Sequence, residues 1–299
     1  MLARLDWERD GLDWPHRESS RFVDAGGLRW HVQVAGRGPL VMLVHGTGAS
    51  THSWRDVLPL LASRFTVLAF DLPGHAFTDK AKADGMSLDG MSRLIEALLG
   101  SLKMAPVLAV GHSAGAAILA RMMIDGRLGA RRLVAFNGAF VPFGGALRVF
   151  SPVAKFLAST SLAAQIASAR GRDPKAVARV LEGTGSRIDA HGAELYGRLV
   201  RSPAHVAGAL AMMANWNLGD LQHDLSRLVG PLCLAVGSND RTVPPEQAAS
   251  VAARIDGATI ERLAGLGHLA HEERPDLAAD IVSRLHDKEL IARTRSRHA

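Results

Sequence analysis

The chain has 299 residues, of which 47% are apolar and 21% are charged, and its formal net charge is +6. This length and apolar content predict one α/β domain with a large core and an inserted lobe, and two separate domains would be a tight fit. No apolar run reaches the roughly 18 residues of a membrane-spanning helix, and residues 1–22 are too polar and acidic for a secretory or transit signal.

The positive charge does not by itself indicate nucleic-acid binding, because the basic residues are scattered and aromatic residues make up only 5% of the chain. The densest basic cluster lies at Arg293, Arg295 and Arg297. We expect a solvated, partly disordered basic tail over 287–299, with weak contact to an anionic membrane surface as the alternative. Cys233 is the only cysteine, so no internal disulfide can form, and a buried thiol in a reducing cytoplasm is expected.

Short apolar segments alternate with helical patterns along much of the chain. Strands are predicted at 28–34, 40–44, 66–70, 107–110, 132–138, 231–237 and 258–263. Helices are predicted at 53–64, 88–102, 114–125 and 274–285. Ser87 is placed to cap the second of these helices. This alternation predicts an α/β fold with a mostly parallel central sheet and helices on both faces.

The alternation of strands and helices stops near residue 140 and resumes at residue 231. The segment between is rich in alanine, broken by Pro and Gly, and has no convincing strand. We therefore expect residues 140–230 to form an inserted helical lid over one end of the sheet. The leader then spans 1–20, and the core is built from 21–139 and 231–286.

The sequence Gly-His-Ser-Ala-Gly at 111–115 stands between a predicted buried strand and a predicted helix. The turn between these elements must be tight, so Ser113 is expected in a strained backbone conformation with its hydroxyl above the sheet. Gly111 and Gly115 leave space for neighbouring backbone, and the helix N-terminus directs N–H groups toward the reacting centre. Ser113 is therefore the predicted nucleophile.

A serine nucleophile needs a base, and the base needs an orienting carboxylate. Asp240 follows the strand 231–236, and His268 follows the last predicted strand, so both lie at the carboxyl edge of the sheet. The order serine, acid, histidine is the one expected for this strand–turn–helix motif. The alternative is an acid after the strand 132–136, but the chain has Asn137 there. Asp240 is therefore the remaining candidate for the acid.

The other nearby histidines are assigned to structural roles. His271, beside two glutamates, is expected to start the closing helix, and His112 is expected to point away from Ser113 and to pack or line the pocket. The histidines are scattered and there is no cysteine pair, so neither a metal site nor a cofactor is predicted. No Gly-Lys-Ser/Thr sequence follows the glycines, so no phosphate loop is predicted either.

The oxyanion of an acyl-transfer reaction needs two fixed N–H donors. We expect these donors to be the backbone N–H groups of Ala114 and Thr47, the second in the His-Gly-Thr-Gly sequence at 45–48. Gly46 and Gly48 allow this loop to approach the substrate closely. His45 is expected to hold the loop in place by a hydrogen bond. The predicted chemistry is acyl transfer followed by hydrolysis.

Segments across nearly the whole chain resemble the α/β-hydrolase superfamily. They are 45–54, 71–75, 111–115, 237–244 and 265–273. A closer resemblance, to the BchO-type magnesium chelatase accessory proteins of bacteriochlorophyll biosynthesis, rests on 7–23, 183–190, 205–218 and 268–273. It implies the α/β-hydrolase fold and a role in pigment synthesis in the cytoplasm or at the edge of the photosynthetic membrane. It also implies a small apolar substrate, a tetrapyrrole being one candidate, and magnesium chelatase subunits as candidate partners.

One position departs from the pattern of the superfamily. Where relatives have Gly-His-Gly after Asp-Leu-Pro, this chain has Gly-His-Ala, with Ala76 in the third position. If the usual glycine has a positive φ, alanine there costs about 1 kcal/mol or shifts the loop. The loop borders the mouth of the predicted site, so access to the site is expected to differ.

Two other functions stay open at this point. The chain could be a non-catalytic accessory protein whose lid binds a porphyrin or assists magnesium chelatase, with Phe143, Phe150 and Phe156 on its surface, although these side chains can equally pack the lid on the core. It could also be a lyase or a C–C bond hydrolase, which would use the same three residues. Dehalogenase and epoxide hydrolase chemistry is disfavoured, because it needs an aspartate in the place of Ser113.

Overall fold

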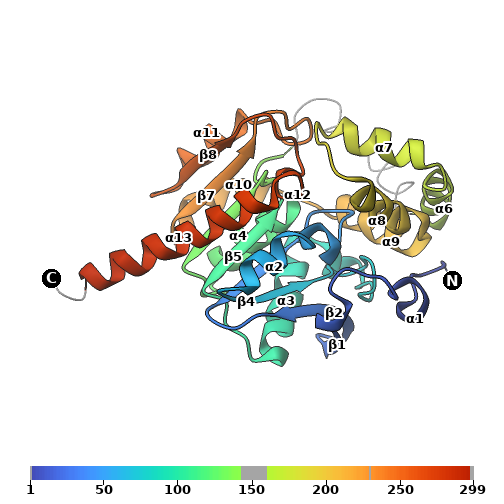
Figure 1. The fold of residues 1–299 in the computed structure, drawn as a ribbon, viewed down its shortest axis with the longest axis horizontal. Coiled ribbons are helices and arrows are strands. Elements are labelled where there is room, and N and C mark those ends of the chain that lie inside the picture. The colour runs from blue at the N-terminus through green and yellow to red at the C-terminus, as the bar shows by residue number, and fades with distance from the viewer. Residues whose placement is uncertain (1, 143–159, 229, 297–299) are drawn as a thin grey trace.

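The computed structural model describes residues 2–142, 160–228 and 230–296 (Figure 1). The strands of this part of the chain are β1 (Ser20–Ala25), β2 (Leu28–Ala35), β3 (Leu40–Val44), β4 (Thr66–Phe70), β5 (Leu108–His112), β6 (Arg132–Phe136), β7 (Leu232–Gly237) and β8 (Thr259–Leu263). They form one sheet in the order β1-β2-β4-β3-β5-β6-β7-β8. The β1–β2 and β2–β4 pairs are antiparallel and all other pairs are parallel.

The buried strands explain why the sequence reads as continuous apolar runs. In β3, Val41 and Leu43 pack into the core on one face of the sheet, whereas Met42 and Val44 pack into the core on the other. All four side chains are fully buried. A parallel strand covered on both faces needs apolar residues at every position, and this confirms the predicted mostly parallel sheet with helices on both faces.

Two groups of helices cover the sheet. One face packs against α3 (Leu88–Leu102), α4 (Ala114–Ile124), α10 (Gly219–Asp224) and α11 (Gln247–Ala252). The other face packs against α2 (Val57–Ala62), α12 (Ala270–Glu273) and α13 (Pro275–Ser296). Ser87 caps α3 as predicted, because its side chain accepts a hydrogen bond from the Gly90 N–H. The helix predicted at 53–64 is instead the 3-10 turn η2 (Thr51–Trp54) followed by α2.

Between β6 and β7, residues 160–228 contain helices and no strand. The helices are α6 (Ser161–Arg170), α7 (Pro174–Gly183), α8 (Ala190–Arg201), α9 (Pro203–Ala214) and α10. Side chains of Thr160, Asp173, Asp189 and Ser202 cap the first four of them, and proline opens α7 and α9. Helices α6 to α9 lie together at one end of the molecule (Figure 1, right). Phe143, Phe150 and Phe156 lie outside the described residues.

The leader packs across both the sheet and the inserted helices. It contains α1 (Trp7–Asp10), whose Trp7 ring contacts Phe22 of β1 and Phe77 of the loop after β4. Arg198 of α8 forms a two-pronged ion pair with Asp13, and the Ala204 N–H of α9 donates to the carbonyl of Ala3. The leader therefore joins the inserted helices to the core.

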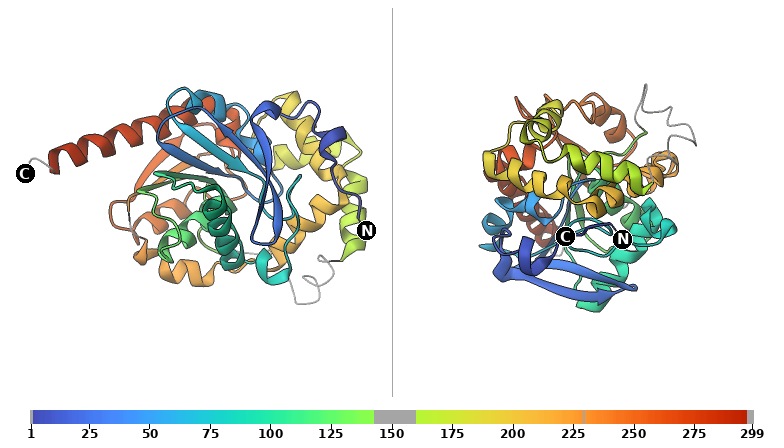
Figure 2. Two further views of the ribbon diagram at one scale, coloured as in Figure 1. Left: turned by 90° about the horizontal axis from the view of Figure 1, so that it is seen from below. Right: turned by 90° about the vertical axis from the view of Figure 1, so that its right-hand side faces the viewer.

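The prediction of a partly disordered tail is wrong for residues 287–296. Helix α13 continues through Ser296 and extends beyond the rest of the molecule (Figures 1 and 2). The physical reason is that this stretch contains good helix formers and neither Gly nor Pro. Residues 297–299 lie outside the described part. None of the helices in the described ranges is both long enough and apolar enough to cross a membrane.

Outside the inserted segment, the strand β1 and the short helices α1, α11 and α12 were not predicted, whereas the single cysteine is where it was expected. Strand β1 has a mixed sequence and an irregular burial pattern, and α11 is a short helix between β7 and β8. Cys233 is fully buried in β7. Burial raises the pKa of its thiol to about 11, as expected for an inert core residue.

Candidate active site

Ser113 stands at a sharp turn between β5 and α4. Its backbone has φ 49° and ψ −118°, a conformation that L-residues rarely adopt. A Cβ on Gly111 would lie 2.5 Å from the Ala116 nitrogen, and one on Gly115 would overlap the carbonyl oxygen of Val44. The two glycines thus allow the close approach that the turn needs, and together they keep Ser113 at the carboxyl end of β5.

The carboxylate of Asp240 is held by four hydrogen bonds on the loop after β7. Oδ1 accepts from the backbone N–H groups of Thr242 and Val243, at 2.7 and 2.9 Å. Oδ2 accepts from Asn137 Nδ2 at 2.6 Å and from His268 Nδ1 at 2.8 Å. Asn137, considered above as a position for the acid, is therefore a hydrogen-bond donor to Asp240. The carboxylate is almost fully buried and can orient the imidazole and stabilise its cation.

His268 lies on the loop after β8 and bonds to Asp240 through its ring. Its Nδ1–H faces Asp240, which leaves Nε2 as the basic nitrogen. Among the described residues, no hydrogen bond joins Nε2 to the hydroxyl of Ser113. Such bonds are often long or poorly aligned before substrate binds, so the lack of this bond does not exclude His268 as the base.

The two neighbouring histidines are buried structural residues. His112 donates from Nε2 to the carbonyl of His268 at 2.9 Å, so it packs behind the base, as expected. His271 lies in the short helix α12 and not at the start of α13, which corrects the sequence expectation. It donates from Nε2 to Ser53 Oγ at 2.8 Å. Burial lowers the pKa of both imidazoles well below the usual value, so both are neutral.

The loop after β3 lies directly against Ser113. A Cβ on Gly46 would lie 3.0 Å from the Cβ of Ser113. His45 donates from Nδ1 to the Gly46 carbonyl and accepts at Nε2 from the Leu72 N–H, so it fastens the loop through both ring nitrogens. Burial lowers the pKa of His45, as this neutral tautomer requires.

Two backbone N–H groups near Ser113 lack an acceptor. Within the described residues, neither the Thr47 N–H nor the Ala114 N–H forms a hydrogen bond. The Ala114 N–H is the first of helix α4, where the helix dipole favours negative charge. The Thr47 hydroxyl donates to the sulfur of Met212 in α9 at 3.4 Å, so an inserted helix lies over this loop.

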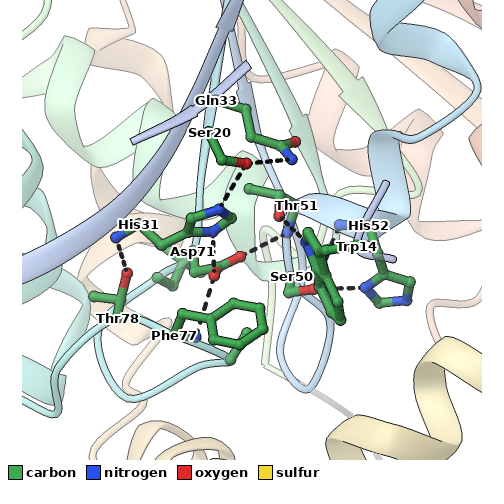
Figure 3. A network of polar contacts seen from close by, with 12 residues as sticks. Trp14, Ser20, His31, Gln33, Ser50, Thr51, His52, Asp71, Phe77 and Thr78 are labelled. Carbon is green, nitrogen blue, oxygen red and sulfur yellow. Dashed lines mark hydrogen bonds and ion pairs between the residues drawn. The ribbon is translucent and has the colours of Figure 1, made fainter. Parts of the chain in front are cut away.

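Asp71 organises the polar network that supports this loop (Figure 3). The carboxylate accepts from the Thr51 N–H at 2.8 Å and from the Phe77 N–H at 3.3 Å, and it pairs with His31 Nδ1 at 2.8 Å. The ring of His31 also reaches Ser20 Oγ, at 3.1 Å. Although burial opposes ionisation, the charge and hydrogen bond of His31 lower the pKa of Asp71 to about 2. A carboxylate is thus fixed between the loops after β3 and β4.

Helix α9 contacts the same two loops through His205. This buried histidine donates from Nε2 to the Gly48 carbonyl at 3.2 Å and accepts at Nδ1 from the Ala76 N–H at 3.0 Å. Burial lowers the pKa of His205 to about 4. Ala76 has a φ of 40°, so the position where relatives have glycine does require a positive φ. The contact with His205 helps to hold alanine in this unfavourable conformation.

A buried carboxylate also joins α12 to the inserted helices. Glu272 accepts from Ser53 Oγ and from the Tyr196 hydroxyl, both at 2.7 Å, and from Arg55 Nη1 at 2.6 Å. Burial raises the pKa of Glu272, while these three donors oppose that rise. Tyr196 belongs to α8, so this cluster connects an inserted helix to the segment that follows His268.

Several residues that support the site were not identified from the sequence. They are His31, Asp71, His205 and Glu272. Of these four, only Asp71 could have been predicted to lie near the site. It directly follows a buried strand at the edge of the sheet that carries Asp240 and His268. Among the described residues, no group of three or more His, Cys, Asp or Glu side chains is arranged to hold a metal ion.

Comparisons with known proteins agree with this architecture. A family model described as "Alpha/beta hydrolase family" matches residues 41–281. The "Magnesium-chelatase 30 kDa subunit" of Rhodobacter capsulatus is 36% identical over 267 residues, which cover 88% of this chain and 93% of that protein.

Solved structures show the same fold at lower sequence identity. An alpha/beta hydrolase fold protein from Burkholderia ambifaria has a TM-score of 0.74 at 24% identity and covers 94% of this chain and 99% of its own. A serine hydrolase involved in carbazole degradation has a TM-score of 0.72 at 21% identity, with coverages of 90% and 98%. At these identities the two structures support the fold alone.

Proposed function

The chain belongs to the alpha/beta hydrolase family, and on that premise we propose that it is a serine hydrolase with Ser113 as nucleophile, His268 as base and Asp240 as orienting acid. The observation that carries this proposal is the constellation at the carboxyl edge of the sheet. A strained serine, a histidine bonded to a buried carboxylate, and two N–H groups without an acceptor in the described part of the chain come from the ends of four strands.

The proposed reaction proceeds through an acyl-enzyme. His268 Nε2 takes the proton of the Ser113 hydroxyl while Oγ attacks the substrate carbonyl carbon. The N–H groups of Thr47 and Ala114 bind the oxyanion, and the imidazolium then gives its proton to the leaving group. Water, deprotonated by the same imidazole, then attacks the acyl carbon. The imidazolium returns this proton to Ser113 Oγ as the carboxylic acid leaves, which restores the free enzyme. Asp240 stays ionised throughout and stabilises the imidazolium.

Labelling with a fluorophosphonate tests the proposed nucleophile. The wild-type protein is expected to gain one phosphonyl group on Ser113, because the reagent needs a serine activated by a base and an oxyanion site. The modified peptide is identified by mass spectrometry, and Ser113→Ala is the control that should not react. A folded wild-type protein that stays unlabelled would contradict the proposal.

We further propose a role in bacteriochlorophyll biosynthesis. The support is the relative in Rhodobacter capsulatus, which is named as a 30 kDa subunit of magnesium chelatase. Two versions of this role are compatible with that name. In the first, the hydrolase acts on an ester-like bond of an apolar substrate such as a tetrapyrrole. In the second, the chain binds a porphyrin or assists magnesium chelatase without catalysis, in the cytoplasm or at the periphery of the photosynthetic membrane.

Complementation of a deletion strain separates these two versions. If catalysis is required, Ser113→Ala is expected to leave pigment synthesis deficient, and the intermediate that accumulates identifies the blocked step. If Ser113→Ala restores pigment fully at wild-type protein levels, the non-catalytic version is correct. Profiling of ester, thioester and C–C bond substrates on the wild-type protein then distinguishes an esterase from a C–C bond hydrolase.

A further inference from the structure

The linker between α7 and α8 lies between the two loops that carry Asp240 and His268. It belongs to the inserted segment, far in sequence from either loop, and contains Thr184, Gly185 and Ser186. It contacts both loops directly beside Asp240 and His268.

Three backbone N–H groups beside the acid and the base find their acceptors in this linker. The carbonyl of Thr184 accepts from the Arg241 N–H at 3.1 Å and from the His268 N–H at 3.3 Å. The hydroxyl of Ser186 accepts from the Leu269 N–H at 2.7 Å. One carbonyl thus bonds both loops, and a buried hydroxyl fixes the residue that follows the base.

Close backbone packing fits the linker against the same loops. Gly185 has a φ of +85°, and a Cβ there would overlap the carbonyl oxygen of Asn239. A Cβ on Gly267, next to the base, would overlap the backbone of Gly185 and Ser186. Only residues without side chains allow this approach from both sides, so the linker and the two loops form one packed unit.

Apart from the bond between His268 and Asp240, the two loops bond to each other at positions other than those that bond to the linker. The Asn239 N–H donates to the Leu266 carbonyl at 2.8 Å, and the Asn239 side chain donates to the Gly265 carbonyl at 2.9 Å. These bonds hold the parts of the loops that precede Asp240 and His268. The linker supplies the acceptors for the N–H groups of Arg241, His268 and Leu269. Buried N–H groups need such acceptors.

We propose that Thr184, Gly185 and Ser186 are positioning residues, which set the geometry of His268 relative to Asp240 and Ser113. This inference rests on the proposed function and deepens it, because it makes an inserted segment part of the catalytic geometry. The linker acts through the backbone of the base and touches no reacting atom. A displacement of about 1 Å at a reacting group can reduce a rate about 100-fold, so these bonds matter for catalysis.

Ser186→Ala is the test variant, because it removes only the acceptor of the Leu269 N–H. The second-order rate of fluorophosphonate labelling and kcat for an activated ester are expected to fall between about 10- and 100-fold, with KM nearly unchanged. Ser186→Thr keeps the hydroxyl and is expected to recover most of the rate. Ser168→Ala is the matched control. Ser168 is also a buried serine of the inserted helices, but among the described residues its side chain bonds only to the Gln165 carbonyl.

A readout independent of hydrolysis is the downfield proton NMR signal of His268 Nδ1–H, which reports the bond to Asp240. It is expected to shift or broaden in Ser186→Ala and to stay unchanged in Ser168→Ala. Unchanged labelling and an unchanged signal in Ser186→Ala would overturn the inference, as would equal losses in Ser186→Thr. If the wild-type protein is never labelled, the proposed function fails, and the NMR comparison still decides whether the linker positions His268.

Discussion

Ser113→Ala and His268→Ala are each expected to lower kcat for an activated ester about 10⁶-fold, whereas Asp240→Asn lowers it about 10⁴-fold. The physical reason for the difference is that serine and histidine carry the bond-making and the proton transfer, while the carboxylate only orients the imidazole and stabilises its charge. The double variant Ser113→Ala/His268→Ala is expected to be no slower than either single variant, because the two residues act as one unit.

Asn137→Ala is the control for these losses of kcat. It removes one donor to Asp240 Oδ2 but leaves the bond from His268 in place, so its effect on kcat should be far smaller than that of Asp240→Asn. Steady-state kinetics on the wild type and the five variants, with circular dichroism to verify folding, provide the measurement. Additive losses in the double variant, or an Asp240→Asn variant as active as the wild type, would contradict the assignment of these three residues.

Strands β2 to β8 and the loops that carry the proposed site residues were predictable for a common reason, which is that both follow from local sequence. β3 and β4 were predicted with their observed limits, because each is a buried run of five apolar or β-branched residues. Once these strands are placed, Ser113, Asp240 and His268 fall on loops at one edge of the sheet. The observed geometry then brings the last two within hydrogen-bond distance.

The supporting residues were missed because their partners lie far away in the sequence. Glu272 bonds Ser53 across 219 positions, and Leu269 bonds Ser186 across 83. A single sequence read for periodicity contains no signal for such pairs. The course of α13 was misjudged for another reason. A charged C-terminal stretch was interpreted as disordered, although its helix propensity is good and the preceding helix supplies the nucleus for its growth.

Asp71→Asn is expected to lower the free energy of unfolding by about 3–5 kcal/mol at pH 7. Asp71 and His31 are both fully buried, so the variant leaves His31 without its anionic partner and weakens the acceptors of the Thr51 and Phe77 N–H groups. Equilibrium unfolding in urea, followed by circular dichroism and tryptophan fluorescence, measures the loss.

The dependence of this stability loss on pH tests whether the ionised carboxylate of Asp71 causes it. The pKa of Asp71 is lowered to about 2 in the folded protein, below its ordinary value of 3.8, so ionisation of this group stabilises the fold above pH 3.8. This contribution is lost as the pH falls through about 2. The difference in the free energy of unfolding between wild type and Asp71→Asn should therefore decrease by about 2 kcal/mol on acidification. About half of this decrease is expected by pH 3.

Asp276→Asn is the matched control, because the pKa of Asp276 is also lowered to about 2 but its side chain is exposed. Its ion pair with Arg274 is screened by water, so this variant should lose less than about 1 kcal/mol. Equal losses of unfolding free energy in the two variants would contradict the role of Asp71. So would a stability difference between wild type and Asp71→Asn that stays the same at pH 5 and pH 3. A large loss of unfolding free energy in Asp71→Asn alone would show that burial matters in addition to the lowered pKa. The buried pair of Asp71 and His31 would then be essential to the loops that hold Thr47 and Ala76.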